Sequence, residues 1–100
     1  MSLTYDPEVG SAYVYVQGPI PAGGVKRPEH LDADRNIDYD ADDRIIGYDF
    51  LNVRRYGVRL DDLEHREELA ALFREAGFQE RDWSHPISTK VVRRRDRAAG

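Results

Sequence analysis

Cysteine is absent from this sequence of 100 residues, which excludes disulfide bonds, thiolate zinc sites and cysteine catalysis. Long apolar runs are absent too, and none approaches the roughly 20 residues that a membrane-spanning helix needs. The first ten residues lack the basic segment followed by an apolar segment that marks a secretory signal. These absences predict a small cytoplasmic protein with one modest hydrophobic core.

The residue spacings of familiar catalytic and cofactor sites are also missing. The three histidines, His30, His65 and His85, are scattered and form no H-x-H or H-x-x-x-H pair that would hold a metal. The pair Gly23-Gly24 lacks the lysine and the Ser or Thr of a phosphate-binding loop. The sequence therefore predicts no catalytic residue and no cofactor, and we expect a binding protein rather than an enzyme.

Negative charge prevails in the body of the chain and positive charge at its end. The formal net charge is −4; residues 90–100 contribute +4, so residues 1–89 carry −8. An acidic body repels the phosphates of nucleic acids. We expect a single domain over residues 1–83 and a flexible basic tail over residues 84–100. Contact with nucleic acid is then expected only through the tail arginines Arg93, Arg94, Arg95 and Arg97.

Three segments have the composition and alternation of β-strands. The segment SAYVYVQ is rich in β-branched and aromatic residues, and it places Tyr13 and Tyr15 on the face opposite the small and branched side chains of Ala12, Val14 and Val16. We expect the latter three to face the core. Residues 35–40 and 44–52 alternate in the same way, and their short connection predicts an antiparallel hairpin. Between these segments, Pro28 limits residues 25–31 to an edge strand or a short extended piece.

The apolar period changes to that of a helix from Asp61 onward. Asp61 is the expected N-cap, with Glu64 three residues later, and Leu69 and Phe73 lie on the apolar stripe. Gly77 is the residue expected to end the helix in a left-handed conformation. This order predicts an α+β fold: a small antiparallel β-meander of three to five strands with one C-terminal amphipathic helix packed on it. Because such a sheet leaves edges free, a homodimer through an edge or through the tyrosine face is expected.

Four short motifs lie in the first two thirds of the chain: Tyr5-Asp6, Ala12-Tyr13-Val14, Ile37-Asp38-Tyr39-Asp40 and Ile45-Ile46-Gly47-Tyr48-Asp49-Phe50-Leu51. Over about residues 3–63 they resemble the domain of unknown function 2283 family, which consists of small bacterial and phage proteins. Two features depart from the pattern: Asp49, where relatives often carry Glu, and the long loop from Gly18 to Pro28. The resemblance implies a small β-rich fold and no activity. Some relatives look like the partner half of toxin–antitoxin-like gene pairs, so an antitoxin-like role is implied by association only.

The acidic run from Asp38 to Asp43 is the segment closest to a metal site. Its alternate aspartates followed by a later carboxylate resemble the ligand order of a calcium loop. However, Asp43 stands where such a loop requires Gly, and the flanks are predicted strands, so an Asp-rich hairpin turn explains the run better. We predict no metal site. The candidates, should one form, are Asp38, Asp40, Asp42 and Asp49, and a metal-dependent small enzyme using this turn with His30 is an alternative function.

The tyrosines of the strands are the residues expected to contact a partner, since aromatic side chains dominate protein interfaces. They are Tyr13, Tyr15, Tyr39 and Tyr48. Neighbouring aspartates would repel phosphates, so stacking of nucleic-acid bases is disfavoured. The sequence therefore predicts a small acidic protein-interaction module that binds a basic protein partner. A homo-oligomeric accessory protein without a ligand is the remaining alternative.

Overall fold

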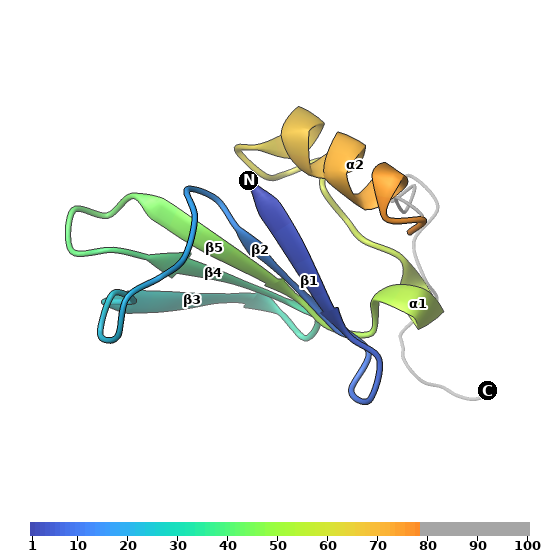
Figure 1. The fold of residues 1–100 in the computed structure, drawn as a ribbon, viewed down its shortest axis with the longest axis horizontal. Helices are drawn as coiled ribbons and strands as arrows, with labels where there is room; N and C mark the ends of the chain where they lie inside the picture. The colour runs from blue at the N-terminus through green and yellow to red at the C-terminus, as the bar shows by residue number, and fades with distance from the viewer. Residues whose placement is uncertain (79–100) are drawn as a thin grey trace.

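The computed structural model describes residues 1–78, and the expected domain end at residue 83 and the tail over residues 84–100 lie outside this part. It contains one sheet and two short helices (Figure 1). The elements are β1 (Ser2–Asp6), β2 (Ser11–Tyr15), β3 (Arg27–Asp32), β4 (Arg35–Tyr39), β5 (Ile45–Phe50), α1 (Val53–Tyr56) and α2 (Arg66–Glu75). No helix among residues 1–78 is both long and apolar enough to cross a membrane.

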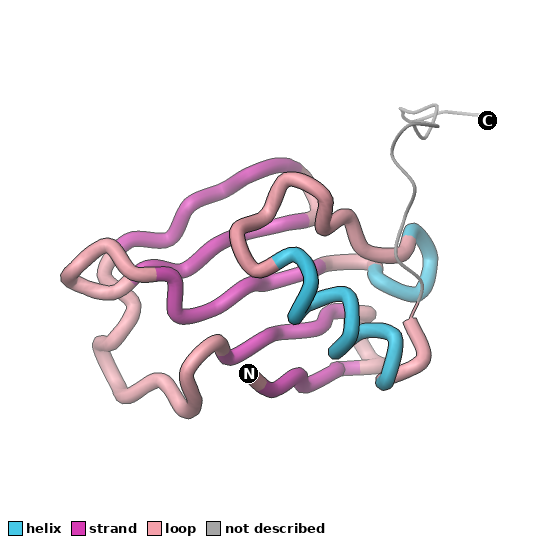
Figure 2. The backbone as a smooth tube through the Cα atoms, turned by 90° about the horizontal axis from the view of Figure 1, so that it is seen from above, coloured by secondary structure: helices cyan, strands magenta, loops and turns pink. Residues whose placement is uncertain are grey.

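The sheet has five strands in the order β1-β2-β5-β4-β3, and every neighbouring pair is antiparallel. The predicted antiparallel sheet is thus confirmed, with strands β3, β4 and β5 forming a meander and β3 on the edge that Pro28 requires. The expectation that all sequential strands are neighbours fails at one place, because β2 pairs with β5 and not with β3. The intervening segment, rich in Gly and Pro, cannot form a tight hairpin and carries the chain to the far edge of the sheet (Figure 2).

The predicted hairpin between residues 35–40 and 44–52 is confirmed as β4 and β5. Its turn depends on aspartate chemistry: the carboxylate of Asp40 accepts hydrogen bonds from the backbone N–H groups of Asp42 and Arg44, at 2.9 and 3.0 Å. Asp43 adopts a positive φ of 59°, which aspartate tolerates better than most residues. The acidic run is therefore used, in this part of the chain, to build a turn.

One face of the sheet forms the core. Ala12 and Val14 are fully buried there, and Val16 packs against them partly exposed, as the alternation of β2 predicts. Phe73 of α2 meets Phe50 of β5 edge to face, with ring centroids 5.0 Å apart. Each large side chain buried in this way stabilises the fold by roughly 1.5–3 kcal/mol. The core consists of Ala12, Val14, Ile37, Tyr48, Phe50, Val53, Val58, Leu60, Leu63, Leu69 and Phe73.

The helical part of the chain differs from the prediction in the number of helices and in where the longer one begins. Two short helices are present where one was expected, and α2 begins at Arg66 with His65 as N-cap and no side-chain cap. The assignment of Asp61 as N-cap is wrong, because residues 61 and 62 lie in a turn before the helix. Gly77, in contrast, has the predicted left-handed conformation, with φ 87°.

The end of α2 is fixed by a pair of backbone hydrogen bonds. Gly77 N–H donates to the carbonyl of Arg74 at 3.1 Å, and Phe78 N–H donates to that of Phe73 at 2.9 Å. This is the Schellman arrangement, in which a left-handed residue lets the chain turn back over the last helical turn. Phe78 then packs against the ring of Tyr5, with centroids 5.0 Å apart, so the chain returns to the body of the fold directly after α2.

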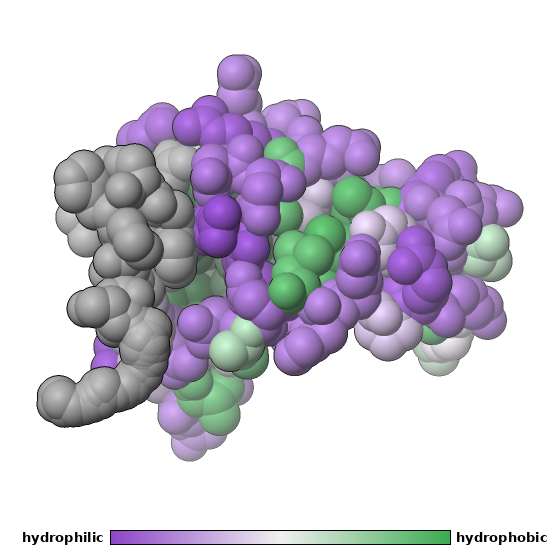
Figure 3. Space-filling view, turned by 180° about the vertical axis from the view of Figure 1, so that it is seen from behind, coloured by the Kyte–Doolittle hydropathy of each residue, from purple (hydrophilic) through white to green (hydrophobic). Residues whose placement is uncertain are grey.

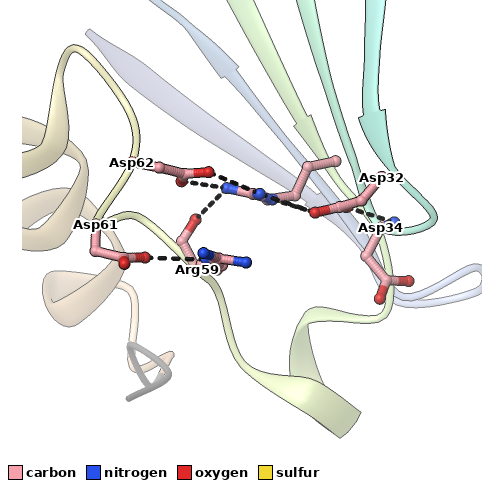
Figure 4. Close-up of polar contacts among 6 residues, drawn as sticks. Asp32, Asp34, Arg59, Asp61 and Asp62 are labelled. Atoms are coloured by element: carbon pink, nitrogen blue, oxygen red, sulfur yellow. Dashed lines mark hydrogen bonds and ion pairs between the residues drawn. The ribbon is translucent and has the colours of Figure 1, made fainter. Parts of the chain in front are cut away.

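Arg35 is the single buried charged residue in the described part of the chain, with 6% of its surface exposed. Its guanidinium donates to both carboxylate oxygens of Asp62, at 2.6 and 3.0 Å, and lies 2.8 Å from Asp32 (Figure 4). It also donates to the carbonyl of Arg59 at 3.2 Å. Burial lowers the pKa of Arg35, but the hydrogen bonds to Asp62 and Asp32 outweigh it and leave the pKa raised. This contact ties β4 to the turn before α2.

Candidate functional site

The face of the sheet opposite the core, called the open face below, is left without a helix in the described part of the chain (Figure 1). Strand alternation places there the residues that lie between the buried ones, and the register aligns them across the sheet. One row consists of Thr4, Tyr13, Asp49, Asn36 and His30, and the next consists of Ser2, Tyr15, Gly47, Asp38 and Pro28. Most of these residues are at least partly exposed.

Tyr13 reaches across a whole strand on this face. Its hydroxyl donates a hydrogen bond of 2.6 Å to Asp38 on β4, although β5 lies between β2 and β4. The ring crosses β5 at Gly47, where a Cβ atom would stand 1.9 Å from the phenolic oxygen. Gly47 does not have a positive φ, so the glycine is needed for space and not for backbone conformation. The missing side chain lets the ring approach the backbone of β5 closely.

Two carboxylates lie close together beside this tyrosine. Asp49 is half-buried and accepts one long hydrogen bond, 3.4 Å, from the amide of Asn36. Burial raises the pKa of Asp49, Asn36 lowers it, and the negative charge of Asp38 raises it again, so that the net shift is upward. Within residues 1–78, no basic side chain forms an ion pair with either Asp38 or Asp49. The open face therefore carries negative charge that the described part of the chain leaves uncompensated.

Neighbouring groups extend this polar surface in two directions. Tyr15 packs edge to face on Tyr13, with ring centroids 4.9 Å apart. On the other side, His30 Nδ1 is hydrogen-bonded to the side-chain oxygen of Asn36. Burial, and then the hydrogen bond to Asp38, raise the pKa of Tyr13, so its hydroxyl stays a donor in alkaline solution as well as at neutral pH. An open depression of about 410 Å³ lies at the β1–β2 end of the face, with Thr4, Ser11, Tyr13 and Asp49 among its lining residues.

The tyrosines that the sequence predicts as partner contacts do not lie together. Tyr13 and Tyr15 are on the open face, whereas Tyr48 is only 1% exposed and belongs to the core. The prediction is wrong for Tyr48, because its register opposite Val14 points it inward, where its hydroxyl meets His65 Nδ1 at 2.8 Å. Tyr39 lies elsewhere: the guanidinium of Arg27 sits 3.9 Å from its ring centre, and its hydroxyl donates to Glu29.

The four aspartates named as metal candidates are divided between two places. Asp40 and Asp42 are at the β4–β5 turn, where each forms an ion pair with Arg44 at 3.1 Å. Asp38 and Asp49 lie on the open face. Among residues 1–78, no group of three or more His, Asp or Glu side chains is placed to hold a metal ion. The fold does not bring the candidate ligands together in the way a calcium loop requires.

The surface seen from the β3 side is mostly hydrophilic, with an apolar patch near its middle (Figure 3).

The model of a protein family described as "Protein of unknown function (DUF2283)" matches residues 2–54, which is more than half of the chain. This chain is a member of the DUF2283 family. No curated protein and no solved structure matches it.

The DUF2283 segment contains all five strands and the first residues of α1, while α2 lies after it. The contact between Tyr13 and Asp38 over Gly47 is therefore built within the family segment. Sequence reasoning placed Tyr13 on this face but missed Gly47 and Asn36 as parts of the site. A glycine inside a strand pattern is a known sign of close approach by another group, and this sign was present in the sequence.

Proposed function

We propose that this chain is a protein-interaction module whose open face binds a basic segment of another protein. The observation that supports the proposal most strongly is the position of Asp38 and Asp49, which lie close together without a cation from residues 1–78. An arginine of a partner would supply the missing charge and donate to both carboxylates. Pairing with the product of an adjacent gene, as in an antitoxin, is one form of this function.

The neighbouring aromatic rings favour arginine over other basic groups. Tyr15 and Tyr13 stand beside the carboxylates, and a planar guanidinium stacks on aromatic rings while it binds a carboxylate. Because the hydrogen bond to Asp38 and the space over Gly47 already hold Tyr13 in place, binding orders few side chains. The charge of −8 over residues 1–89 also speeds the approach of a basic partner.

The test compares two pairs of charge-neutralising substitutions in the full chain. D38N/D49N removes the two open-face charges, and the control D42N/D43N removes two charges from the exposed β4–β5 turn. Binding is measured by calorimetry with an arginine-rich peptide and with a glutamine-substituted peptide of equal length. We expect D38N/D49N to weaken binding of the arginine peptide at least tenfold, about 1.4 kcal/mol, and the control to change it far less.

Co-expression with the adjacent gene product, followed by co-purification, identifies the natural partner. The same two variants are then applied to that complex. Equal losses from both variants would show that only net charge matters. That result, or the absence of binding to any basic protein or peptide, would contradict a site on the open face.

A further inference from the structure

The two edges of the sheet are built differently. Edge strand β3 contains Pro28, which has no N–H group, and its register is broken between His30 and Asp32. Edge strand β1 contains no proline and pairs with β2 in unbroken register over all five of its residues. Proline, bulges and charge are the usual protection of a sheet edge against pairing. Among the described residues, β1 has neither a proline nor a bulge, and its one charged residue, Asp6, is at its end. No other strand pairs with the outer side of β1 (Figure 2).

The backbone groups that β1 leaves free follow from the hydrogen bonds of β2. Val16 N–H donates to the carbonyl of Ile46, so the even-numbered residues of β2 bond to β5 and the odd-numbered ones bond to β1. In β1, the residues opposite these odd-numbered partners are Ser2, Thr4 and Asp6. Leu3 and Tyr5 therefore direct their N–H and C=O groups outward.

We propose that two copies of this chain pair through antiparallel β1 strands, with Thr4 facing Thr4 of the second copy at the two-fold axis. In this register Leu3 faces Tyr5 of the second copy, and each such pair exchanges two backbone hydrogen bonds. Leu3 and Tyr5 are half-buried on the core side, so each covers the exposed part of the other. Asp6 faces Ser2, and like charges are not opposed. The strand is complementary to itself in backbone groups and in apolar side chains.

This inference does not depend on the proposed function, because pairing through β1 leaves the open face of each copy accessible. The axis is perpendicular to the sheet, so both open faces of the dimer lie on the same side. Two binding faces on one side would allow bivalent attachment to a partner with repeated basic segments.

The experiment measures the mass of the full chain by sedimentation as its concentration is raised. We expect the mass to double from 11.5 kDa. T4K places two lysines opposite each other at the axis and T4D places two aspartates there, so each variant alone should dimerise at least tenfold more weakly. An equimolar mixture of T4K and T4D should recover the dimer as a heterodimer. H30K, in the same row at the opposite edge, is the matched control and should dimerise as the unaltered chain does.

Hydrogen exchange of the Leu3 and Tyr5 amides gives a second measurement. In the proposed dimer both amides are protected, and the protection disappears on dilution. A chain that stays monomeric up to about 1 mM overturns the proposal. So does a mixture of T4K and T4D that fails to recover the dimer. Protection of both amides that persists in the dilute monomer overturns it too, because another segment of the same chain then occupies the β1 edge.

Discussion

The hydroxyl of Tyr13 donates a 2.6 Å hydrogen bond to Asp38, which lies on a strand that is not its neighbour. The two residues are 25 positions apart in the sequence, and β5 runs between their strands. The contact exists because the residue of β5 beneath the ring is Gly47. It fixes both an aromatic ring and a carboxylate on the face that we propose for partner binding.

Replacing Gly47 with alanine should displace Tyr13 from Asp38. The new Cβ atom would stand 1.9 Å from the phenolic oxygen, and the ring is the group that can move. We expect G47A to lower the free energy of unfolding by about 1–2 kcal/mol, through the lost hydrogen bond and ring packing. Urea denaturation of the variant measures this change.

The matching control for Gly47 is its substitution in a chain that already carries Y13A. With the ring removed, the three atoms that a Cβ atom at position 47 would meet most closely are gone, and G47A should then cost much less. The double-mutant cycle should show a coupling of about 1–2 kcal/mol between the two sites. Equal costs of G47A in both backgrounds would show that the glycine serves the backbone and not the tyrosine.

Asp49 should reduce stability in the free protein. Its pKa is raised by burial and by the charge of Asp38, so the folded state binds a proton more tightly than the unfolded state does. Stability is then lost as the pH rises from the unfolded pKa of about 3.9 through the higher folded pKa. We expect D49N to raise stability at pH 7 by on the order of 0.5 kcal/mol, since solvent screens a half-buried carboxyl, and thermal melting measures it.

The pH dependence is the control for the Asp49 prediction. The gain from D49N should disappear below the unfolded pKa, where the carboxyl is protonated in both states. In the same variant, binding of the arginine peptide should weaken, because the peptide loses one of its two carboxylate partners. The charge that binds the peptide is thus the one that destabilises the free protein. A variant that is less stable at every pH would contradict the assignment of Asp49 as a partly buried charge that no cation compensates.

The pair of Asp62 and Arg35 should have the opposite pH dependence. The hydrogen bonds from Arg35 lower the pKa of Asp62, so its contribution is complete above the unfolded pKa of about 3.9 and is lost as the pH falls through the lower folded value. We expect D62N to cost about 1–2 kcal/mol at pH 7, because a buried guanidinium loses one of its two carboxylate partners. Urea denaturation at pH 7 and at low pH measures the cost, which should vanish at low pH.

D61N is the matched control for this prediction. Asp61 is the adjacent aspartate, and its ion pair with Arg59 is exposed. Its substitution should change stability by less than about 0.5 kcal/mol. Equal effects of D61N and D62N would show that the buried arginine does not depend on Asp62.

Substitutions of Tyr48 and Tyr15 should distinguish a tyrosine that stabilises the core from one that binds a partner on the open face. Burial raises the pKa of Tyr48 to about 12, and its hydroxyl is bonded to His65. We expect Y48F to lower stability by about 1 kcal/mol and to leave peptide binding unchanged. Y15A should weaken binding of the arginine peptide with a smaller effect on stability. Weaker peptide binding by Y48F than by Y15A would place the binding surface elsewhere.

Much of the sheet was predictable from local patterns. The alternation of SAYVYVQ correctly assigned Ala12 and Val14 to the core and Tyr13 to the opposite face, because a strand has a fixed period of two. The β4–β5 hairpin and the left-handed Gly77 followed from turn chemistry, which depends on a few adjacent residues. The beginning of α2 did not follow, because Asp62 binds Arg35, distant in the sequence, and the turn before the helix is held by that contact.

The sequence by itself determined which side chains share a face of each strand, and it determined the negative charge and the family membership of this protein. Only the tertiary structure decided which faces and residues meet. The insertion of β5 between β2 and β4 brings Tyr13, Gly47 and Asp38 to one place and carries Tyr48 into the core. The physical reason is that strand order is set by long-range pairing and by burial of the whole core. The alternation of side chains within one segment is the same in every possible strand order, so it cannot show which strand order the sheet adopts.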